Sequence, residues 1–368
     1  MIKFSCEKVF LQNAIAVTSR AVAQKSSIPA LEGLLIHADQ QLTISGYNMQ
    51  TGIRTNVFAN VVEGGDIVLN ARLFGDIIRR MPDDMITFTA DEKMMVHVSC
   101  GDADFDILGL SAADYPDLPE VEDEYAVSMQ QKVLRSMIEE VAFAVSTNES
   151  RPVHTGALFE IADMSLSMVA VDGFRLAFRL EKLEGGAFSF VCPGSALSEV
   201  KSICGDTEDL VTVTLGKRHI LFEIGDTQLI CRRLEGEFLD YKNAIPRKNP
   251  IQIVAETKAL IESIDRVSVV ISDKLKSPVR CLFDHDKVML SAKTGNGEAK
   301  DVCRVSGDGD KLEIGFNNRY LMEALRYAPA DKVKIELNTG VSPAIIVPVE
   351  GEENFLYMVL PVRLKSAE

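Results

Sequence analysis

The chain has 368 residues, which exceeds one ordinary core and favours about two or three domains. Hydrophobic residues make up 46% and charged residues 25%, a balance that excludes a disordered or membrane-embedded chain. No apolar run reaches the roughly 20 residues of a spanning helix, and residues 1–9 lack the apolar core of a secretion signal. We therefore expect a cytoplasmic protein without membrane partners. Its net charge of −15 ordinarily argues against nucleic-acid binding, because affinity for phosphates comes from Lys and Arg.

The sequence repeats itself three times, with a period of about 124 residues. Each third opens with apolar residues spaced three and four apart, the pattern of a helix with one buried stripe. These residues are Leu11, Ala14, Ile15, Thr18 and Val22; Leu134, Met137, Ile138, Val141 and Val145; and Leu260, Ile264, Val267 and Ile271. A strand pair follows in each third and ends in alternating segments at 42–45, 166–170 and 288–291. We expect turns after them at Gly46, at Asp172 and Gly173, and at Asn296 and Gly297.

A second, shorter helix follows each strand pair and leads into a strand of period two. The apolar positions of the helices are Phe74, Ile77, Ile78 and Met81; Leu197, Val200, Ile203 and Cys204; and Leu321, Ala324, Leu325 and Ala328. The strands are expected at 85–88, 210–213 and 333–336. Each third closes with a tyrosine followed by a proline, as in Tyr115 and Pro116.

This pattern predicts an α+β fold of three repeated domains, each with two amphipathic helices on a mostly antiparallel sheet. Boundaries are expected in the acidic stretch 116–124 and around 247–250. The domains would span residues 1–122, 123–249 and 250–368, with six helices in all.

Basic residues concentrate on the helix faces opposite the apolar stripes, whereas acidic residues concentrate in loops and strands. Each of these basic residues taken alone is an ordinary solvated residue. Taken together, they favour a protein with a mildly positive inner surface and a negative outer surface. A ring could then hold DNA by closing around it, which removes the objection from net charge. The basic residues are Lys8, Arg20, Arg72, Arg79, Arg80, Lys132, Arg135, Lys201, Lys258, Arg266, Arg319 and Arg326.

Four segments, at 112–120, 171–178, 236–246 and 357–364, resemble the bacterial DNA polymerase III β subunit, and the resemblance covers the whole chain in register. It implies a DNA sliding clamp: a head-to-tail homodimer forming a six-domain ring around double-stranded DNA. Such a processivity factor has no catalytic residues, cofactor or metal. Its implied partners are the DNA polymerase III catalytic subunit, the clamp loader, and other polymerases and repair proteins with clamp-binding peptides.

The resemblance also implies a peptide pocket between the second and third domains, in which aliphatic anchors enter an apolar slot and Arg175 and Arg363 supply polar groups. For Val359, Leu360 and Val362, the alternative to a binding role is that they are ordinary buried residues of a strand. His154, Leu239, Asn243 and Pro343 differ from residues common in relatives. The implied pocket residues are His154, Val171, Gly173, Phe174, Arg175, Leu176, Leu239, Asn243, Ala244, Val341, Pro343, Met358, Val359, Leu360, Pro361, Val362 and Arg363.

Two further sites follow from the resemblance. The DNA-facing residues would be Lys25, Asn148, Arg72, Arg79, Arg80, Lys201, Lys274 and Lys276, each weak and redundant, with a plain exposed loop as the alternative. The dimer contact would join Phe105 and Ile107 of one copy to Val269 and Val270 of the other. Asp102 and Asp104 stand where relatives often carry basic side chains, which puts the flanking ion pairs in doubt.

Two rival functions were weighed. An enzyme should show a nucleophile, base and orienting group in a known motif, and none occurs. The segment Asp284, His285, Asp286 resembles a metal site but fits a polar turn better, and Gly307 and Gly309 indicate another turn. A purely structural repeat protein would lack the pocket and the apolar ending at 358–364. Seven scattered cysteines without a CxxC pair indicate buried reduced thiols.

Overall fold

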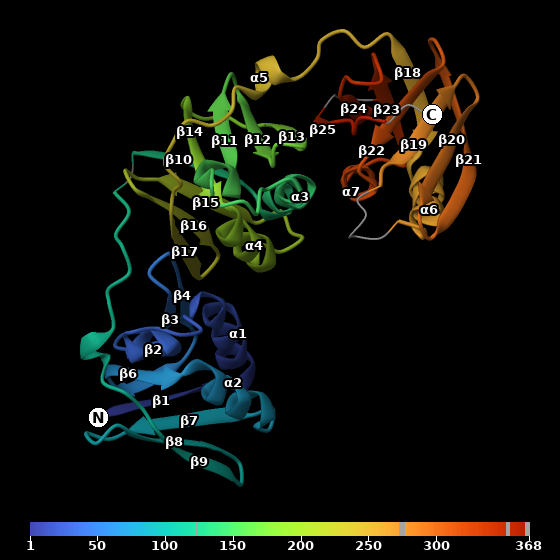
Figure 1. The fold of residues 1–368 in the computed structure, drawn as a ribbon. Coiled ribbons are helices and arrows are strands. Elements are labelled where there is room, and N and C mark those ends of the chain that lie inside the picture. Colours follow the sequence, from blue (N-terminus) through green and yellow to red (C-terminus); the bar gives the residue numbers. More distant parts are fainter. Residues whose placement is uncertain (123, 272–276, 351–353, 365–368) are drawn as a thin grey trace. The chain divides into compact units, whose positions relative to one another are not determined.

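The computed structural model describes residues 1–122, 124–271, 277–350 and 354–364 (Figure 1). They form two compact units: residues 1–135 with 198–233, and residues 136–197 with those from 234 onward. Every strand pairing in them is antiparallel. The α+β fold predicted from the repeats is confirmed.

The first unit contains two sheets. One has five strands in the order β5 (Asn60–Glu63), β1 (Ile2–Glu7), β7 (Met85–Ala90), β8 (Met95–Cys100) and β9 (Ala103–Leu108). The other has eight, in the order β10 (Tyr125–Gln130), β15 (Leu210–Leu215), β16 (His219–Ile224), β17 (Thr227–Arg232), β4 (Thr51–Val57), β3 (Leu42–Tyr47), β2 (Gly33–Ala38) and β6 (Gly65–Asn70).

The second unit contains one sheet of twelve strands. Their order is β14 (Phe188–Pro193), β11 (Gly156–Ala162), β12 (Ser165–Val171), β13 (Arg175–Lys182), β25 (Phe355–Val359), β24 (Ala344–Pro348), β23 (Lys332–Leu337), β18 (Ile251–Glu256), β21 (Gly297–Asp308), β20 (Lys287–Thr294), β19 (Val279–Asp284) and β22 (Leu312–Phe316). Two sheets therefore cross the expected boundaries, because β4 pairs with β17 and β13 pairs with β25. Period two predicted strands that correspond to β3, β7, β12, β15, β20 and β23, but it could not identify partners so distant in the sequence.

The helices lie where the apolar stripes predict them. They are α1 (Lys8–Thr18), α2 (Ala71–Arg80), α3 (Gln131–Ala142), α4 (Gly194–Ile203), α5 (Tyr241–Ala244), α6 (Thr257–Ser268) and α7 (Asn318–Arg326). The described residues hold one helix more than the six predicted, because α5 is a single turn without room for an apolar stripe. Short 3-10 helices occupy Ser19–Ala21, Pro29–Glu32, Ala112–Asp114 and Pro152–Thr155.

Side-chain caps and buried stripes explain where the helices begin and how they pack. Asn70 accepts a hydrogen bond from Leu73 N at 2.9 Å at the start of α2, and Asn317 caps α7 in the same way. The stripe of α1, with Leu11 and Ile15, joins α2 and strands of both sheets in one core. All seven cysteines are buried and outside disulfides, and burial raises the pKa of the Cys281 thiol to about 12.

Three local predictions are wrong. Gly46 is not a turn but lies in β3, where an added Cβ would sit 2.1 Å from the carbonyl oxygen of Thr18. Gly307 likewise lies in β21, where a Cβ would meet Gln252 O at 2.2 Å. Both glycines allow close backbone approach, a role distinct from turn formation. Lys8 does not face outward, because its largely buried ammonium donates to Met81 O at 2.6 Å and pairs with Asp83.

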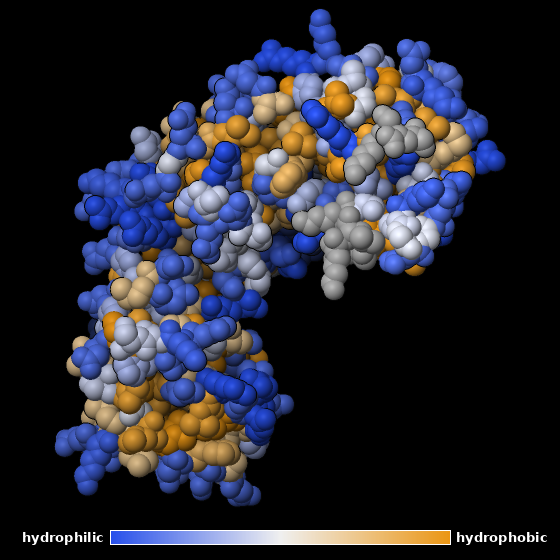
Figure 2. Space-filling view, viewed as in Figure 1, coloured by the Kyte–Doolittle hydropathy of each residue, from blue (hydrophilic) through white to orange (hydrophobic). Residues whose placement is uncertain are grey.

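Hydrophilic residues cover most of the surface in Figure 2, and hydrophobic residues gather in patches on both units. Among the described residues, no helix is long and apolar enough to cross a membrane.

Candidate functional site

One face of the twelve-stranded sheet gathers apolar side chains from strands that are far apart in the sequence. Leu176 of β13 lies opposite Met358 of β25, and Phe178 lies opposite Leu356. Residues two apart share a face of a strand, so these four side chains form one strip. Val171, Ile345 and Val347 extend the strip into a mostly buried cluster. We call this surface the apolar strip.

The segment around α5 packs onto the apolar strip. Tyr241 is buried in the strip, and its hydroxyl donates to Glu160 Oε2 at 2.6 Å. Lys242 donates to the other oxygen of Glu160 at 3.0 Å. Burial opposes ionisation of Glu160, but these two hydrogen bonds outweigh it and lower the pKa of the carboxyl group. The contacts therefore hold α5 against the sheet.

A cavity of about 330 Å³ opens on the apolar strip beside α5. The sequence prediction did not include the residues that line this cavity. Two of them lie close to predicted pocket residues: Phe178 is two residues from Leu176, and Leu356 is two residues from Met358. Alternation along a strand would have found them. Its lining residues are Ser167, Phe178, Tyr241, Lys242, Ile245, Arg247 and Leu356.

Exposed apolar residues occur among those predicted for the pocket. Phe174 is 57% exposed and Val341 73%, and Leu239 is also exposed. Phe174 stacks on Tyr320 with ring centroids 5.7 Å apart. Its turn is fixed by Gly173, whose φ of +88° suits glycine. An exposed apolar side chain whose turn has a defined conformation is suited to binding an apolar partner.

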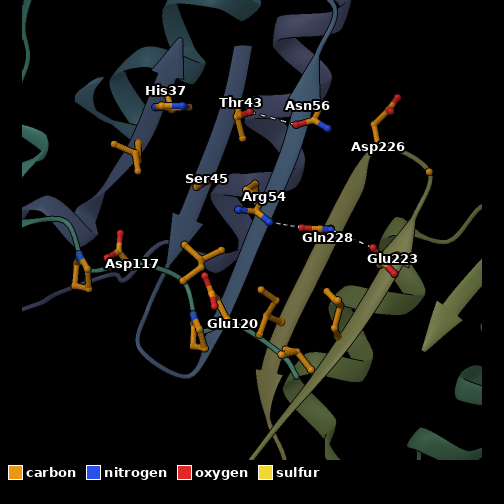
Figure 3. Close-up of a pocket in the computed structure, with 18 residues that line it drawn as sticks. His37, Thr43, Ser45, Arg54, Asn56, Asp117, Glu120, Glu223, Asp226 and Gln228 are labelled. Carbon is orange, nitrogen blue, oxygen red and sulfur yellow. Dashed lines mark hydrogen bonds between the residues drawn. The ribbon is translucent and has the colours of Figure 1, made fainter. Parts of the chain in front are cut away.

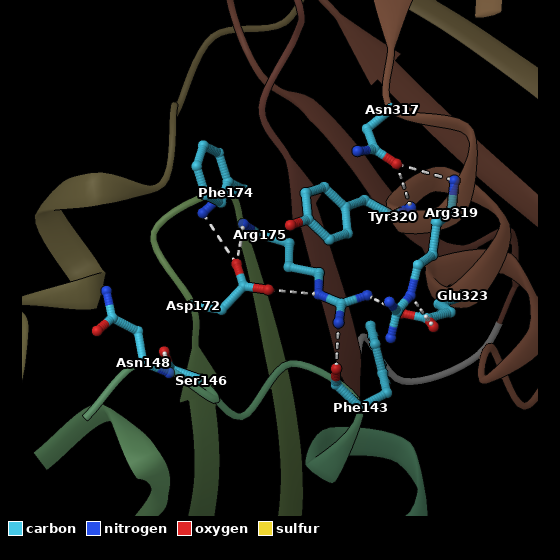
Figure 4. Close-up of polar contacts among 10 residues, drawn as sticks. All are labelled: Phe143, Ser146, Asn148, Asp172, Phe174, Arg175, Asn317, Arg319, Tyr320 and Glu323. Atoms are coloured by element: carbon cyan, nitrogen blue, oxygen red, sulfur yellow. Dashed lines mark hydrogen bonds and ion pairs between the residues drawn. The ribbon is translucent and has the colours of Figure 1, made fainter. Parts of the chain in front are cut away.

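Arg175 and Val359 require a correction, because they lie opposite each other on the other face of the sheet from Leu176 and Met358. The side chain of Arg175 is only 6% exposed. Figure 4 shows its guanidinium pointing among Asp172, Glu323 and the carbonyl oxygen of Phe143, all of which it contacts. Arg175 therefore ties α7 to β13 and does not offer a free polar group to a ligand. Val359 is fully buried, which matches the alternative of strand burial.

Several predicted pocket residues act through their backbone or sit at the edge of the surface. Leu360 N donates to Phe174 O, and Val362 N donates to Gly315 O, both at 2.8 Å. His154 packs edge-on against Phe238, and burial, aided by Arg151, lowers the pKa of its imidazole. Asn243 donates to Asp240 Oδ2 at 2.7 Å. Ala244, Pro343 and Pro361 are half-buried, and Gly173 and Arg363 are exposed.

The predicted DNA-facing residues differ in their exposure and in their ion pairs. Arg72, Lys25 and Asn148 are exposed. Arg79 and Arg80 are also exposed, but both pair with Asp76 on the same helix. Lys201 is half-buried and has a partner. Lys274 and Lys276 lie outside the described residues.

A groove of about 1060 Å³ lies in the first unit between the eight-stranded sheet and residues 116–121 (Figure 3). Arg54 donates to Gln228, which in turn donates to Glu223 at 3.1 Å. Carboxylates outnumber cations along its walls, so the groove repels phosphate and does not suit DNA. Its acidic residues are Asp117, Glu120, Glu223 and Asp226. Among the described residues, no cluster of His, Cys, Asp or Glu is arranged to hold a metal, and His285 and Asp286 form the expected turn.

Three models of one protein family match the chain in succession. They describe the N-terminal, central and C-terminal domains of the DNA polymerase III β subunit and match residues 2–119, 128–240 and 242–363. The chain belongs to the DNA polymerase III β subunit family. The resemblance found in the sequence is confirmed, and a sliding clamp is a non-catalytic subunit.

Relatives of the β subunit family match the chain over its full length. The β sliding clamp of Staphylococcus aureus is 28% identical over 376 residues, covering 99% of this chain and 100% of that protein. The sliding clamp of Bacillus subtilis has a TM-score of 0.94 at 26% identity, and the β subunit of Streptococcus pyogenes has 0.94 at 28%. Both structures cover 99% of this chain and are themselves covered completely. The whole fold, not one domain, is shared.

The predicted dimer residues of this β subunit family member lie on an edge strand and at the end of a helix. Phe105 and Ile107 belong to β9, the last strand of the five-stranded sheet. Phe105 is exposed, whereas Ile107 packs against the first core. Val269 caps the end of α6 and is exposed, and Val270 O accepts a hydrogen bond from Thr294 Oγ1 at 2.8 Å.

Proposed function

We propose that the chain is a DNA sliding clamp, in which two copies close head to tail around double-stranded DNA and tether a DNA polymerase to it. The observation that carries the proposal is the match of all three β subunit domains along the chain, together with TM-scores of 0.94 to clamps. Domains of 1–122, 123–249 and 250–368 and a cytoplasmic location belong to this proposal.

The charge distribution supports topological holding of DNA. A net charge of −15 disfavours tight binding, and a sliding protein needs only weak, interchangeable phosphate contacts. Arg79 and Arg80, paired with Asp76, would make such contacts. The same role is proposed for Arg72, Lys25, Asn148, Lys201, Lys274 and Lys276.

The apolar strip supports a docking site for partner peptides. An aromatic or aliphatic anchor would enter the cavity beside Tyr241, while Phe174, Leu239 and Val341 would cover further apolar side chains. The proposed partners are the DNA polymerase III catalytic subunit, the clamp loader, and other polymerases and repair proteins. Because all of these partners would use the same surface, they would compete for it and replace one another.

Retention on DNA tests the ring. The protein is loaded by its clamp loader onto circular or linearised DNA and then washed at a salt concentration that suppresses electrostatic binding. A topological clamp stays on circles and runs off linear ends. Equal loss from circular and linear DNA would contradict the ring and favour the alternative of a purely structural repeat protein.

Peptide binding tests the docking site separately. A fluorescent peptide from the clamp-binding segment of the same organism's polymerase is titrated against wild type and Phe174→Ala. We expect at least tenfold weaker binding, about 1.4 kcal/mol, because an exposed anchor contact is lost. The matched control is Phe58→Ala, an exposed aromatic in the other unit, which should leave binding unchanged. If both variants lose the same amount of peptide affinity, the peptide site does not lie on the apolar strip.

A further inference from the structure

The two larger sheets contain the same succession of eight strands. In the first unit the order is β10, β15, β16, β17, β4, β3, β2 and β6, and in the second it is β18, β23, β24, β25, β13, β12, β11 and β14. The strands correspond one to one in the order of the sequence repeat. The pair of β17 and β4 therefore stands where the pair of β25 and β13 carries the apolar strip.

The groove between β17, β4 and residues 116–121 occupies this corresponding position, and we call it the linker groove. Arg54 of β4 lies opposite Gln228 of β17. The corresponding pair in the apolar strip is Phe178 and Leu356. Each pair lines a cavity, of about 1060 Å³ in the linker groove and about 330 Å³ in the apolar strip. A guanidinium and an amide thus replace the two apolar side chains of the proposed peptide site.

Residues 116–121 are held on the sheet by packing and by a hydrogen bond. The side chain of Leu118 lies so close to Gly52 that an added Cβ would meet it at 3.0 Å. Tyr115, just before this segment, is buried, and its hydroxyl donates to Ser45 O at 3.3 Å. The segment therefore forms a defined wall of the linker groove, just as α5 forms a wall beside the apolar strip.

Carboxylates lie on two sides of the linker groove. Asp117 and Glu120 belong to the segment 116–121. Glu223 lies on β16, and Asp226 lies in the turn after it. Figure 3 shows Arg54 between these two pairs of acids. The other polar residues that line the groove are His37, Thr43, Ser45, Asn56 and Gln228.

Apolar side chains also line the linker groove. Leu35 and Leu221 are half-buried, and Ile230 is buried. An extended peptide sends successive side chains to opposite sides, so neighbouring lysines or arginines would reach both pairs of acids. Their aliphatic stems would cover the apolar side chains. The chemistry of the groove therefore matches a basic segment in an extended conformation.

We infer that the linker groove is a second docking site, which binds a short extended segment of a partner protein that is rich in lysine and arginine. The inference rests on the proposed clamp function, because the partners would be proteins that act on the same DNA. The carboxylates attract such a segment and repel an acidic one. The apolar strip disfavours the same segment, because burying a lysine among apolar side chains is costly. One copy would therefore hold a basic segment and an apolar peptide together.

Binding of oligolysine tests the inference. A fluorescein-labelled peptide of about eight lysines, which spans about 26 Å when extended, is titrated against the whole chain at about 0.15 M salt. Fluorescence anisotropy measures binding. The groove variant combines Asp117→Asn, Glu120→Gln and Asp226→Asn, which neutralise exposed acids. We expect it to bind oligolysine about tenfold more weakly than wild type, because most of the negative charge lining the groove is lost.

The matched control neutralises exposed acids of the same unit outside the groove, by Glu63→Gln with Glu92→Gln and Asp206→Asn. The change of net charge is the same as in the groove variant. The control should bind oligolysine within about twofold of wild type, because distant charges are screened. If wild type fails to bind oligolysine, or if both variants lose the same affinity, the linker groove is not a docking site for basic segments.

Competition separates the linker groove from the apolar strip. A saturating amount of the polymerase's clamp-binding peptide should leave oligolysine bound, whereas displacement would mean that both peptides share one site and would overturn the inference. The groove variant should bind the polymerase peptide like wild type, and circular dichroism verifies its folding. If wild type binds oligolysine but not the polymerase peptide, the proposed site on the apolar strip fails and the linker groove stands. Retention on circular DNA tests the ring independently of both sites.

Discussion

The centre around Arg175 and the edges at β9 and β21 use the same kinds of charged residue in opposite surroundings. The guanidinium of Arg175 is 6% exposed and contacts Asp172, Glu323 and a backbone carbonyl within one unit. Its Cζ also lies 4.7 Å from the centre of the Tyr320 ring. Asp104 and Arg304, by contrast, are exposed on strand segments that pair with a described strand on one side only.

Burial decides what such charges do. A charge removed from water must keep every partner, so the Arg175 centre fixes how α7 packs on β13. An exposed charge interacts weakly in water and contributes little to folding. It can still decide which surface approaches, because unlike charges attract and like charges repel. The buried ion pairs of Arg175 therefore serve the fold, whereas the exposed charges contribute little to it.

The largest effect is expected for Arg175→Ala. Removing the guanidinium leaves Asp172 and Glu323 without a buried partner, which should lower the free energy of unfolding by about 3–5 kcal/mol. The matched control is Arg319→Ala, because Arg319 pairs with the same Glu323 at 2.9 Å but is 74% exposed. It should cost about 1 kcal/mol or less. Urea unfolding of both variants measures the difference, and similar costs would show that burial does not separate the two arginines.

A smaller, pH-dependent effect is expected at Glu323. Burial favours its neutral form, but hydrogen bonds from Arg175 and Arg319 outweigh burial and lower the pKa of the carboxyl group. A lowered pKa means that the ionised form stabilises the fold, fully above about pH 4.5 and progressively less as the pH falls below it. Glu323→Gln should therefore cost about 1–3 kcal/mol at pH 7.

Urea unfolding at pH 7 and pH 3.5 measures how this cost changes. The difference between wild type and Glu323→Gln should shrink at the lower pH, because the carboxyl group of the unfolded chain then binds a proton and the ionised folded form stabilises less. A difference that stays constant would mean that shape, not charge, makes Glu323 important.

Local periodicity was sufficient to predict the six longer helices, a strand beside each of them and the repeat, but not the single turn α5. It could also have separated Arg175 and Val359 from the apolar strip, since each is adjacent in sequence to a residue of that strip and so faces the other way. Gly46 and Gly307 were misread as turns because a close approach between distant backbones leaves no local signal. The pairings of β4 with β17 and β13 with β25 depend on contacts across more than one hundred residues, which no local pattern encodes.

The smallest effect is expected from salt on the edges. If the acids of β9 in one copy attract Lys300 and Arg304 of β21 in the other copy of the proposed dimer, raising the salt concentration should weaken the wild-type dimer, because the screening length falls from about 10 Å at 0.1 M to about 3 Å at 1 M. The loss should be a few-fold, since exposed pairs contribute little each. Asp104→Asn with Asp106→Asn should flatten this dependence without abolishing the dimer, because Phe105 and its apolar neighbours remain. Analytical ultracentrifugation across the salt series compares the two slopes. If the neutralised variant keeps the wild-type slope, other charges guide the contact. Asp104 and Asp106 would then serve only to prevent two β9 edges from pairing with each other.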